Sequence, residues 1–405
     1  MLRSFRVANH KSIKAEQELL LMPAYAKERP AVPVAAVFGA NASGKSNLLG
    51  ALRWMCTAVR ESYANWEPGT GLPRDPFLLD HAAAGESSLF VVALVLDGVR
   101  WTYGFTVDDR RVAGEWLYTY PHNRKRAVFE RDGGAWSFGS GVPQAESGLL
   151  RGLTRDNALF LSVASRSDFE PTARVYGWFQ RGVRFAQPAS DGVVDAVARR
   201  LERASDLERD RFVDLVRAAD LGIADLRVDH LAPSRTDQDI RDGRTDLLFL
   251  HSPSDAPLHI DEQSAGTVAW LSLLTSALST LETGGLLCVD EIDTSLHPRL
   301  TARLIELFHD PGINRHDAQL IFTTHDATLL GTSFGDEILA RDEVWFVEKD
   351  AQGRTTLYPL TDFHPRKDEN TERRYLGGSY GAVPAVFSGT LADRYRGVEA
   401  VRAAS

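Results

Sequence analysis

A run of eight residues, Gly39-Ala-Asn-Ala-Ser-Gly-Lys-Ser46, has the composition and spacing to bind the phosphates of a nucleotide. It matches the phosphate-loop pattern G-x-x-x-x-G-K-S in full. Its two glycines let the backbone approach a phosphate, and the N–H groups of the helix that follows point at it. Lys45 would place a positive charge beside the β- and γ-phosphates, and the Ser46 hydroxyl would bind Mg²⁺. The pattern therefore predicts a site for a nucleoside triphosphate with Mg²⁺.

The residues on both sides of this loop favour the same interpretation. Residues 34–38 form a short apolar run that is typical of a strand buried on both faces. After the loop, apolar residues recur at helical spacing, at positions 48, 52, 55, 56 and 59. A chance glycine-rich turn is the alternative, but strand, loop and helix together indicate a phosphate-binding unit.

Two later apolar runs each end in residues suited to phosphate chemistry. Residues 286–289 precede Asp290 and Glu291, and residues 319–324 precede His325. Asp290 would lie near the Mg²⁺ ion, and Glu291 could polarise a water that attacks the γ-phosphate. The His325 ring could donate a hydrogen bond to the same phosphate. Solvated acids and a structural histidine at strand ends are the alternatives, and the phosphate loop upstream favours the catalytic interpretation.

Residues 264–267 (Ser-Ala-Gly-Thr) stand at the predicted start of an apolar helix. Ser264 can cap that helix, which is a sufficient structural explanation. The same helix N-terminus is also a second anion site. Such a site is surplus within one chain, so Ser264, Gly266 and Thr267 would be useful if they faced the nucleotide of another subunit.

The pattern of elements divides the chain into four parts. Residues 1–140 combine the phosphate-loop unit with a meander of antiparallel strands. Residues 141–245 are predicted to be mainly helical, residues 246–362 alternate helix and strand, and residues 363–405 form a C-terminal tail. We expect an α/β fold with a mixed parallel core sheet, an antiparallel β lobe and a helical insertion.

Composition limits the partners and the location. The chain has 405 residues, of which 43% are hydrophobic and 25% charged, and its net charge is −9. The acidic balance argues against a general electrostatic attraction to nucleic acid, which stays possible through a local basic patch but is not indicated. There are two cysteines, no leader segment and no apolar run long enough for a membrane span. These features predict a cytoplasmic protein that does not contact a membrane.

Taken in order, the motifs resemble the ABC-type ATPase heads of the SMC, RecF and OLD group. The resemblance starts at Asn9-His-Lys-Ser12 and continues through the phosphate loop, residues 264–267 and the Asp-Glu strand end. It ends with residues 295–298 (Ser-Leu-His-Pro) and the Thr-Thr-His325 strand end. It implies an ATPase that converts ATP and water to ADP and phosphate.

The resemblance also implies a P-loop NTPase of the ABC-ATPase-head type, with ATP and Mg²⁺ held between the chains of a homodimer or higher oligomer. The implied nucleotide-binding residues are Lys11, Gly39, Ala40, Asn41, Ala42, Ser43, Gly44, Lys45, Ser46 and Asn47, and the implied catalytic residues are Lys45, Glu291 and His325. The implied metal ligands are Ser46 and Asp290, the signature that crosses the dimer is Ser264, Gly266 and Thr267, and the D-loop is Asp293, Ser295, Leu296 and His297. In one departure from the family, no residue is assigned to the Q-loop glutamine.

The C-terminal part resembles RloA/AbiL-type ATPases of bacterial abortive-infection systems, in residues 341–350, 366–370 and 375–384. This implies a switch subunit of an anti-phage defence system that controls a separate effector, nuclease-like and encoded by a neighbouring gene. The alternative is a RecF- or SMC-like DNA-maintenance ATPase that binds DNA directly. A slow ATP-dependent clamp without a catalytic role is also open, whereas a transporter subunit is disfavoured.

Overall fold

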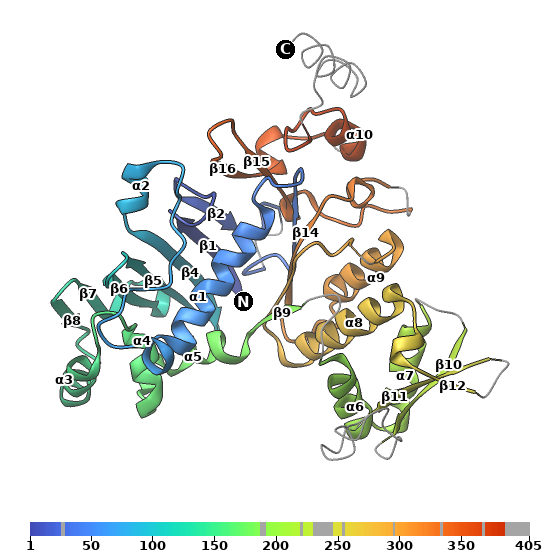
Figure 1. Cartoon of the computed structure of the whole chain (residues 1–405), viewed down its shortest axis with the longest axis horizontal. Coiled ribbons are helices and arrows are strands. Elements are labelled where there is room, and N and C mark those ends of the chain that lie inside the picture. The colour runs from blue at the N-terminus through green and yellow to red at the C-terminus, as the bar shows by residue number, and fades with distance from the viewer. Residues whose placement is uncertain are drawn as a thin grey trace, which may run out of the picture.

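The computed structural model describes residues 1–25, 29–186, 192–218, 222–229, 246–252, 256–294, 296–332, 335–366 and 369–384. A six-stranded sheet of order β16-β15-β3-β14-β13-β9 crosses the middle of the molecule (Figure 1). Its strands are β3 (Val34–Phe38), β9 (Val183–Ala186), β13 (Leu286–Val289), β14 (Gln319–Thr324), β15 (Val344–Lys349) and β16 (Thr355–Pro359).

The direction of these strands decides where the site can form. β9, β13, β14, β3 and β15 run parallel, and β16 returns antiparallel to β15 as a hairpin. The carboxyl ends of the parallel strands therefore meet at one edge of the sheet and their amino ends at the other. In such sheets ligands bind beyond the carboxyl ends.

Each face of this sheet packs against a different layer. In β3, Ala35 and Val37 belong to one core, together with α1 (Lys45–Asn65), whereas Ala36 and Phe38 belong to the other. The alternation follows from the period of two in a strand. All five residues of β3 are buried, which confirms the strand predicted from the sequence.

The first core lies between α1 and a seven-stranded antiparallel sheet of order β2-β1-β4-β5-β6-β7-β8 (Figure 1). This sheet contains the predicted antiparallel meander, which is confirmed. Helices α4 and α5 pack against α1 and close the core. The bounds are β1 (Leu2–Ala8), β2 (Gln17–Leu20), β4 (Ser88–Leu96), β5 (Val99–Val107), β6 (Val112–Tyr120), β7 (Arg126–Asp132), β8 (Ala135–Phe138), α2 (His81–Gly85), α3 (Gln144–Leu153), α4 (Phe160–Ala164) and α5 (Glu170–Arg181).

The second core lies on the opposite face, under α8 and α9. Helices α6 and α7 and a three-stranded sheet of order β10-β11-β12 extend this layer, so the helices of residues 141–245 divide between the two cores. Residues 233–245, the polar end of that segment, lie outside the described residues. The bounds are α6 (Val193–Arg203), α7 (Asp206–Arg217), α8 (Ala265–Thr283), α9 (Pro298–His309), β10 (Ile223–Asp229), β11 (Asp246–His251) and β12 (Pro257–His259).

The tail after β16 packs back onto the central sheet. Its helix α10 (Thr371–Leu376) carries Tyr375, which stacks on Phe346 at 5.5 Å between ring centroids and meets Phe38 edge-on at 5.9 Å. Phe38 is the last residue of β3, so the tail supports the strand that leads into the phosphate loop. Within the part of the chain that the structure describes, the helices are too short or too polar to cross a lipid bilayer.

Candidate nucleotide-binding site

The phosphate loop connects the carboxyl end of β3 to the start of α1. Its backbone is left-handed at Ala42, with φ of 62°, and at Gly44, with φ of 112°. A Cβ at Gly44 would collide with the Thr355 side chain, and one at Gly39 would lie 2.5 Å from the Val347 carbonyl oxygen. Both glycines are therefore required where the loop crosses the β15–β16 hairpin, and the loop is fixed from beneath by that hairpin.

A directed chain of hydrogen bonds holds the loop in this position. The Thr355 hydroxyl donates to the Ser43 carbonyl at 2.9 Å, so it accepts from the Ser12 hydroxyl 2.7 Å away. Ser12 in turn accepts from the Asn47 amide at 2.6 Å. Ser12 stands in the Asn9-His-Lys-Ser12 segment that the resemblance had singled out, but Thr355 carries no sequence signal because it lies about 300 residues after the loop.

Lys45 is buried at the first position of α1. Its ammonium donates to the carbonyls of Gly39 at 2.7 Å and Ala40 at 3.1 Å. Burial lowers the pKa of Lys45, and the negative charges of Glu291 and neighbouring aspartates act to raise it. The carboxylates that follow β13 therefore lie close enough to Lys45 for their charges to interact with its ammonium group. The structure brings these two sequence-predicted groups together.

The end of β14 orients the two carboxylates that follow β13. The Thr323 hydroxyl donates to Asp290 Oδ1 at 2.6 Å and accepts from the Glu291 backbone N–H at 2.7 Å. Glu291 has a left-handed backbone, with φ of 49°, and its side chain is exposed. Thr323 thus directs Asp290 inward and Glu291 outward, a role that sequence reasoning did not assign. Its signal in the sequence is a pair of threonines at the end of a buried strand.

Ser46 and Asp290 line one cavity of about 440 Å³ beside the phosphate loop. Lys11 and His10 line the same cavity. A hydroxyl and a carboxylate suit Mg²⁺, which is commonly bound by one or two protein oxygens together with phosphates and water. Among the described residues no group of three or more His, Cys, Asp or Glu side chains is arranged to hold a metal ion by itself.

His325 and Asp293 form a pair at the same edge of the sheet. The His325 Nε2 lies 3.0 Å from Asp293 Oδ2, with the histidine side chain half-exposed and the carboxylate 8% exposed. Asp293 Oδ1 is buried without a hydrogen-bond partner among the described residues. The carboxylate is therefore placed to orient the imidazole ring. Next to it, η5 (Ala327–Leu330) packs against α10, so the tail supports this loop as well.

The signature residues lie elsewhere in the chain. Ser264 caps α8 by accepting from the Thr267 N–H at 3.1 Å, and the two hydroxyls are 2.8 Å apart. The yellow start of α8 lies beside α7 and the three-stranded sheet, away from the start of α1 (Figure 1). One chain therefore does not bring Ser264, Gly266 and Thr267 to its own phosphate loop.

Among the D-loop residues, Leu296 is buried and His297 is exposed and caps α9 through its ring nitrogen. Ser295 lies outside the described residues.

β9 supplies a feature that sequence reasoning missed. Its last residue, Ala186, pairs with Val289, the residue before Asp290. The chain thus reaches the carboxyl edge at this point, and the next residue in the sequence is Gln187, outside the described residues. The four-residue strand was overlooked because it follows directly on a helix.

A parallel sheet with a phosphate loop at its carboxyl edge and an Asp-Glu pair on a neighbouring strand defines a P-loop ATPase fold, and the predicted α/β class is confirmed. Residues 34–331 match the protein-family model described as "AAA domain, putative AbiEii toxin, Type IV TA system". That range covers more than half of the chain, so the chain belongs to this family.

Two solved structures are similar to the chain. The SMC head domain from Thermotoga maritima is 14% identical, with a TM-score of 0.42, over 88% of this chain and 98% of that one. The Smc head domain with a coiled coil and joint derived from Pyrococcus yayanosii is 11% identical, with a TM-score of 0.45, over 93% and 99%. No curated protein matches the chain.

Proposed function

We propose that this chain hydrolyses ATP at the carboxyl edge of its central sheet and acts as a switch subunit. The observation that carries the proposal is the meeting of two segments that are distant in the sequence. Lys45 and Ser46 begin α1, and Asp290 and Glu291 follow β13 at the same edge. A glycine turn unrelated to phosphate binding would not be expected to lie opposite Asp290 and Glu291, which buried Thr323 holds in place.

Each side chain has a distinct task in this proposal. Lys45 exchanges its two carbonyl acceptors for phosphate oxygens, since both are weaker partners than an anion. Ser46 and Asp290 would hold Mg²⁺, which neutralises charge that develops on the phosphates. Glu291 accepts a proton from the attacking water, a step typically worth about 10²–10⁴-fold in rate. His325 would exchange Asp293 for a γ-phosphate oxygen at its Nε2 and donate a hydrogen bond to that oxygen.

The nucleotide site is completed by a second chain. Ser264 is exposed at the N-terminus of α8, and its hydroxyl and the helix dipole together suit an anion. Because α8 starts away from the phosphate loop of its own chain, the anion would belong to a partner chain in a head-to-head dimer. Asp293 and His297 would lie at the same interface.

A matched pair of helix-cap variants tests this dimer. Ser264→Arg should lower ATP hydrolysis by about 10²-fold, because it removes a phosphate contact made across the interface. Ser205 is an exposed cap of α7, and Ser205→Arg should cost similar stability without an effect on hydrolysis. Equal hydrolysis by the two variants would show that Ser264 has no role in the site.

We further propose that the switch serves anti-phage defence through a separate effector. The description of the matched family names a toxin of a type IV toxin–antitoxin system, and the tail resembles abortive-infection ATPases. On this basis the chain is a cytoplasmic subunit whose dimer closure controls a nuclease-like product of a neighbouring gene.

Expression of the native operon with a tag on this chain tests the partner. A neighbouring gene product should co-purify, and cells should resist phage unless Lys45 is changed to alanine. Lys125→Ala, an exposed turn residue, is the matched control and should leave resistance intact. If no neighbouring product co-purifies, the two-component proposal fails while the ATPase proposal stands.

A further inference from the structure

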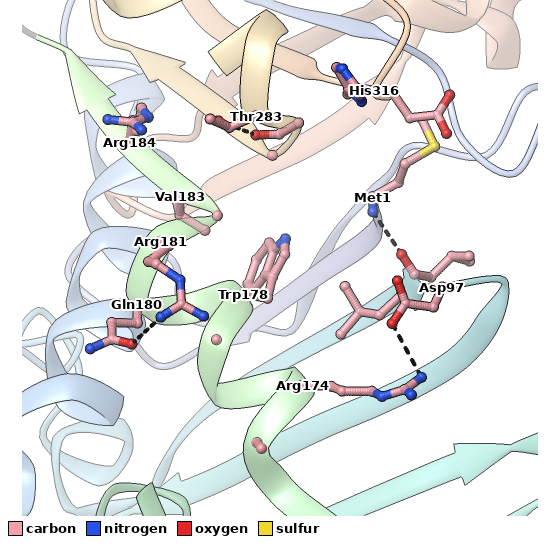
Figure 2. Close-up of a pocket in the computed structure, with 18 of the residues that line it drawn as sticks. Met1, Asp97, Arg174, Trp178, Gln180, Arg181, Val183, Arg184, Thr283 and His316 are labelled. Carbon is pink, nitrogen blue, oxygen red and sulfur yellow. Dashed lines mark hydrogen bonds and ion pairs between the residues drawn. The ribbon is translucent and has the colours of Figure 1, made fainter. Parts of the chain in front are cut away.

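A cavity of about 1180 Å³ opens at the amino edge of the central sheet, opposite the nucleotide site (Figure 2). Its walls include Val183 at the start of β9, Gly285 directly before β13, and His316 and Asp317 shortly before β14. No part of the proposed ATPase mechanism uses this cavity.

Helix α5 presents guanidinium groups to the cavity. Arg174, Trp178 and Arg181 are spaced i, i+4 and i+7, which places them on one face of the helix. Gly177, on the same face, leaves room between them. Figure 2 shows Arg174, Trp178 and Arg181 around the cavity, together with Arg184 of β9.

Several donors at this surface lack strong acceptors. Arg174 pairs with Asp97 at 3.2 Å, but Arg181 donates only to the neutral Gln180 side chain among the described residues, at 3.2 Å. The exposed Arg184 side chain makes no hydrogen bond or ion pair with any described residue. Trp178 is 6% exposed, and its indole N–H is buried with no acceptor among the described residues. A buried N–H without an acceptor is costly, so a ligand acceptor here would be stabilising.

Two neighbouring hollows share lining arginines with this cavity. Arg181 also lines a hollow of about 310 Å³ with other residues of α5, and Arg184 also lines one of about 500 Å³ with residues of α6. The basic side chains that line the three hollows outnumber the acidic ones, although the whole chain has a net charge of −9. They are Arg60, Arg166, Arg174, Arg181, Arg184, Arg199, Arg200 and Arg203, against Asp97, Asp168, Asp317, Glu208 and Glu282.

We propose that this arginine-lined surface binds the phosphodiester backbone of a nucleic acid. Guanidinium groups match phosphate geometry through paired N–H donors. Three neighbouring hollows that share Arg181 and Arg184 fit an extended polyanion better than one small anion. Trp178 is buried rather than displayed as a stacking platform, so the surface reads the backbone and not the bases. The proposal concerns a surface separate from the nucleotide site and does not depend on the defence role.

Fluorescence anisotropy with labelled oligonucleotides of about 30 nucleotides tests the proposal, with single-stranded DNA, duplex DNA and single-stranded RNA as separate arms. The double variant Arg181→Ala/Arg184→Ala should weaken binding at least about tenfold near 100 mM salt. It should also reduce the slope of log K against log salt by about 1.4 for single strands or about 1.8 for duplex, since two phosphate contacts are lost. The arm with the highest affinity identifies the form of nucleic acid.

Matched controls separate this surface from folding and from the ATPase. Arg110→Ala/Arg111→Ala removes two exposed arginines from the β5–β6 turn and should leave affinity and slope unchanged. The Arg181→Ala/Arg184→Ala variant should retain ATP binding, which would show that it is folded. Absence of oligonucleotide binding by the wild-type protein in all three arms at 50 mM salt would overturn the proposal. Equal binding by wild type and by Arg181→Ala/Arg184→Ala would also overturn it. Tighter binding of a poly-glutamate peptide than of any oligonucleotide would overturn it in favour of an acidic protein partner.

Discussion

The two edges of the central sheet offer an anion different kinds of binding group. At the carboxyl edge, a glycine loop and the N-terminus of α1 surround one buried lysine, and the carboxylates of Asp290 and Glu291 stand opposite. At the amino edge, α5 and α8 end, and exposed arginines gather where those helices stop.

The contrast follows from the direction of the backbone. Helix N-termini carry partial positive charge and bind anions through N–H groups, whereas helix C-termini carry partial negative charge and favour cations. The carboxyl edge therefore needs one lysine to bind a triphosphate. The amino edge has arginine side chains, such as Arg181 at the end of α5, which suit its helix C-termini and leave donors over for a ligand. Backbone geometry thus accounts for a compact, specific site at one edge and an extended, adaptable surface at the other.

We expect Lys45→Ala to have the largest effect, because it should weaken ATP binding at the carboxyl edge and leave oligonucleotide binding at the amino edge unchanged. Loss of this buried cation should cost about 3 kcal/mol or more of binding free energy, hence about 100-fold or greater weakening of ATP binding. Isothermal titration with ATP and Mg²⁺ measures the effect, with Lys125→Ala as the surface control. Oligonucleotide affinity should not change. A parallel loss of oligonucleotide binding would break the comparison, since it would make the two edges one site.

Thr323→Val should separate positioning from stability at the carboxyl edge. It keeps the volume of the side chain but removes the hydroxyl that orients Asp290 and the Glu291 backbone. Partners of metal ligands typically contribute about 10–100-fold to activity, so the ATPase rate should fall by that amount. Thr275→Val is a matched control, because Thr275 is buried and donates to a helix carbonyl. If both variants hydrolyse ATP at the wild-type rate, Thr323 does not position the carboxylates.

A third prediction concerns the pH dependence of stability at the carboxyl edge. His10 is buried against Phe90, and burial together with the charge of Lys11 lowers its pKa to about 4, although Asp75 acts to raise it. Between pH 6.5 and about 4 the unfolded chain binds this proton and the folded chain does not, so stability falls as the pH drops through that window. The loss reaches about 3 kcal/mol at its lower end.

His10→Phe should remove that loss, because phenylalanine is aromatic and does not titrate. Urea unfolding at pH 7 and pH 5 measures the difference, with exposed His316→Asn as the control. The same pH dependence in wild type and His10→Phe would exclude His10 as its source.

The features that could be predicted from the sequence are those formed by residues that are neighbours along the chain. The loop from Gly39 to Ser46 is contiguous, and Asp290 and His325 each follow a buried apolar strand, so pattern alone placed them at one edge. Contacts between distant segments could not be predicted, such as Thr355 beneath Gly44. β9 is too short to show a period, and the arginines of the amino edge share a surface only because α5 ends where β9 begins.

The central claim is that the carboxyl-edge site closes against a second chain, and Glu291→Gln tests it most directly. This variant keeps the phosphate contacts but lacks the base for hydrolysis, so ATP should stay bound. Light scattering after size-exclusion chromatography should give twice the mass of one chain with ATP and Mg²⁺, and the mass of one chain without nucleotide. A Glu291→Gln protein that binds ATP yet remains monomeric would contradict the account.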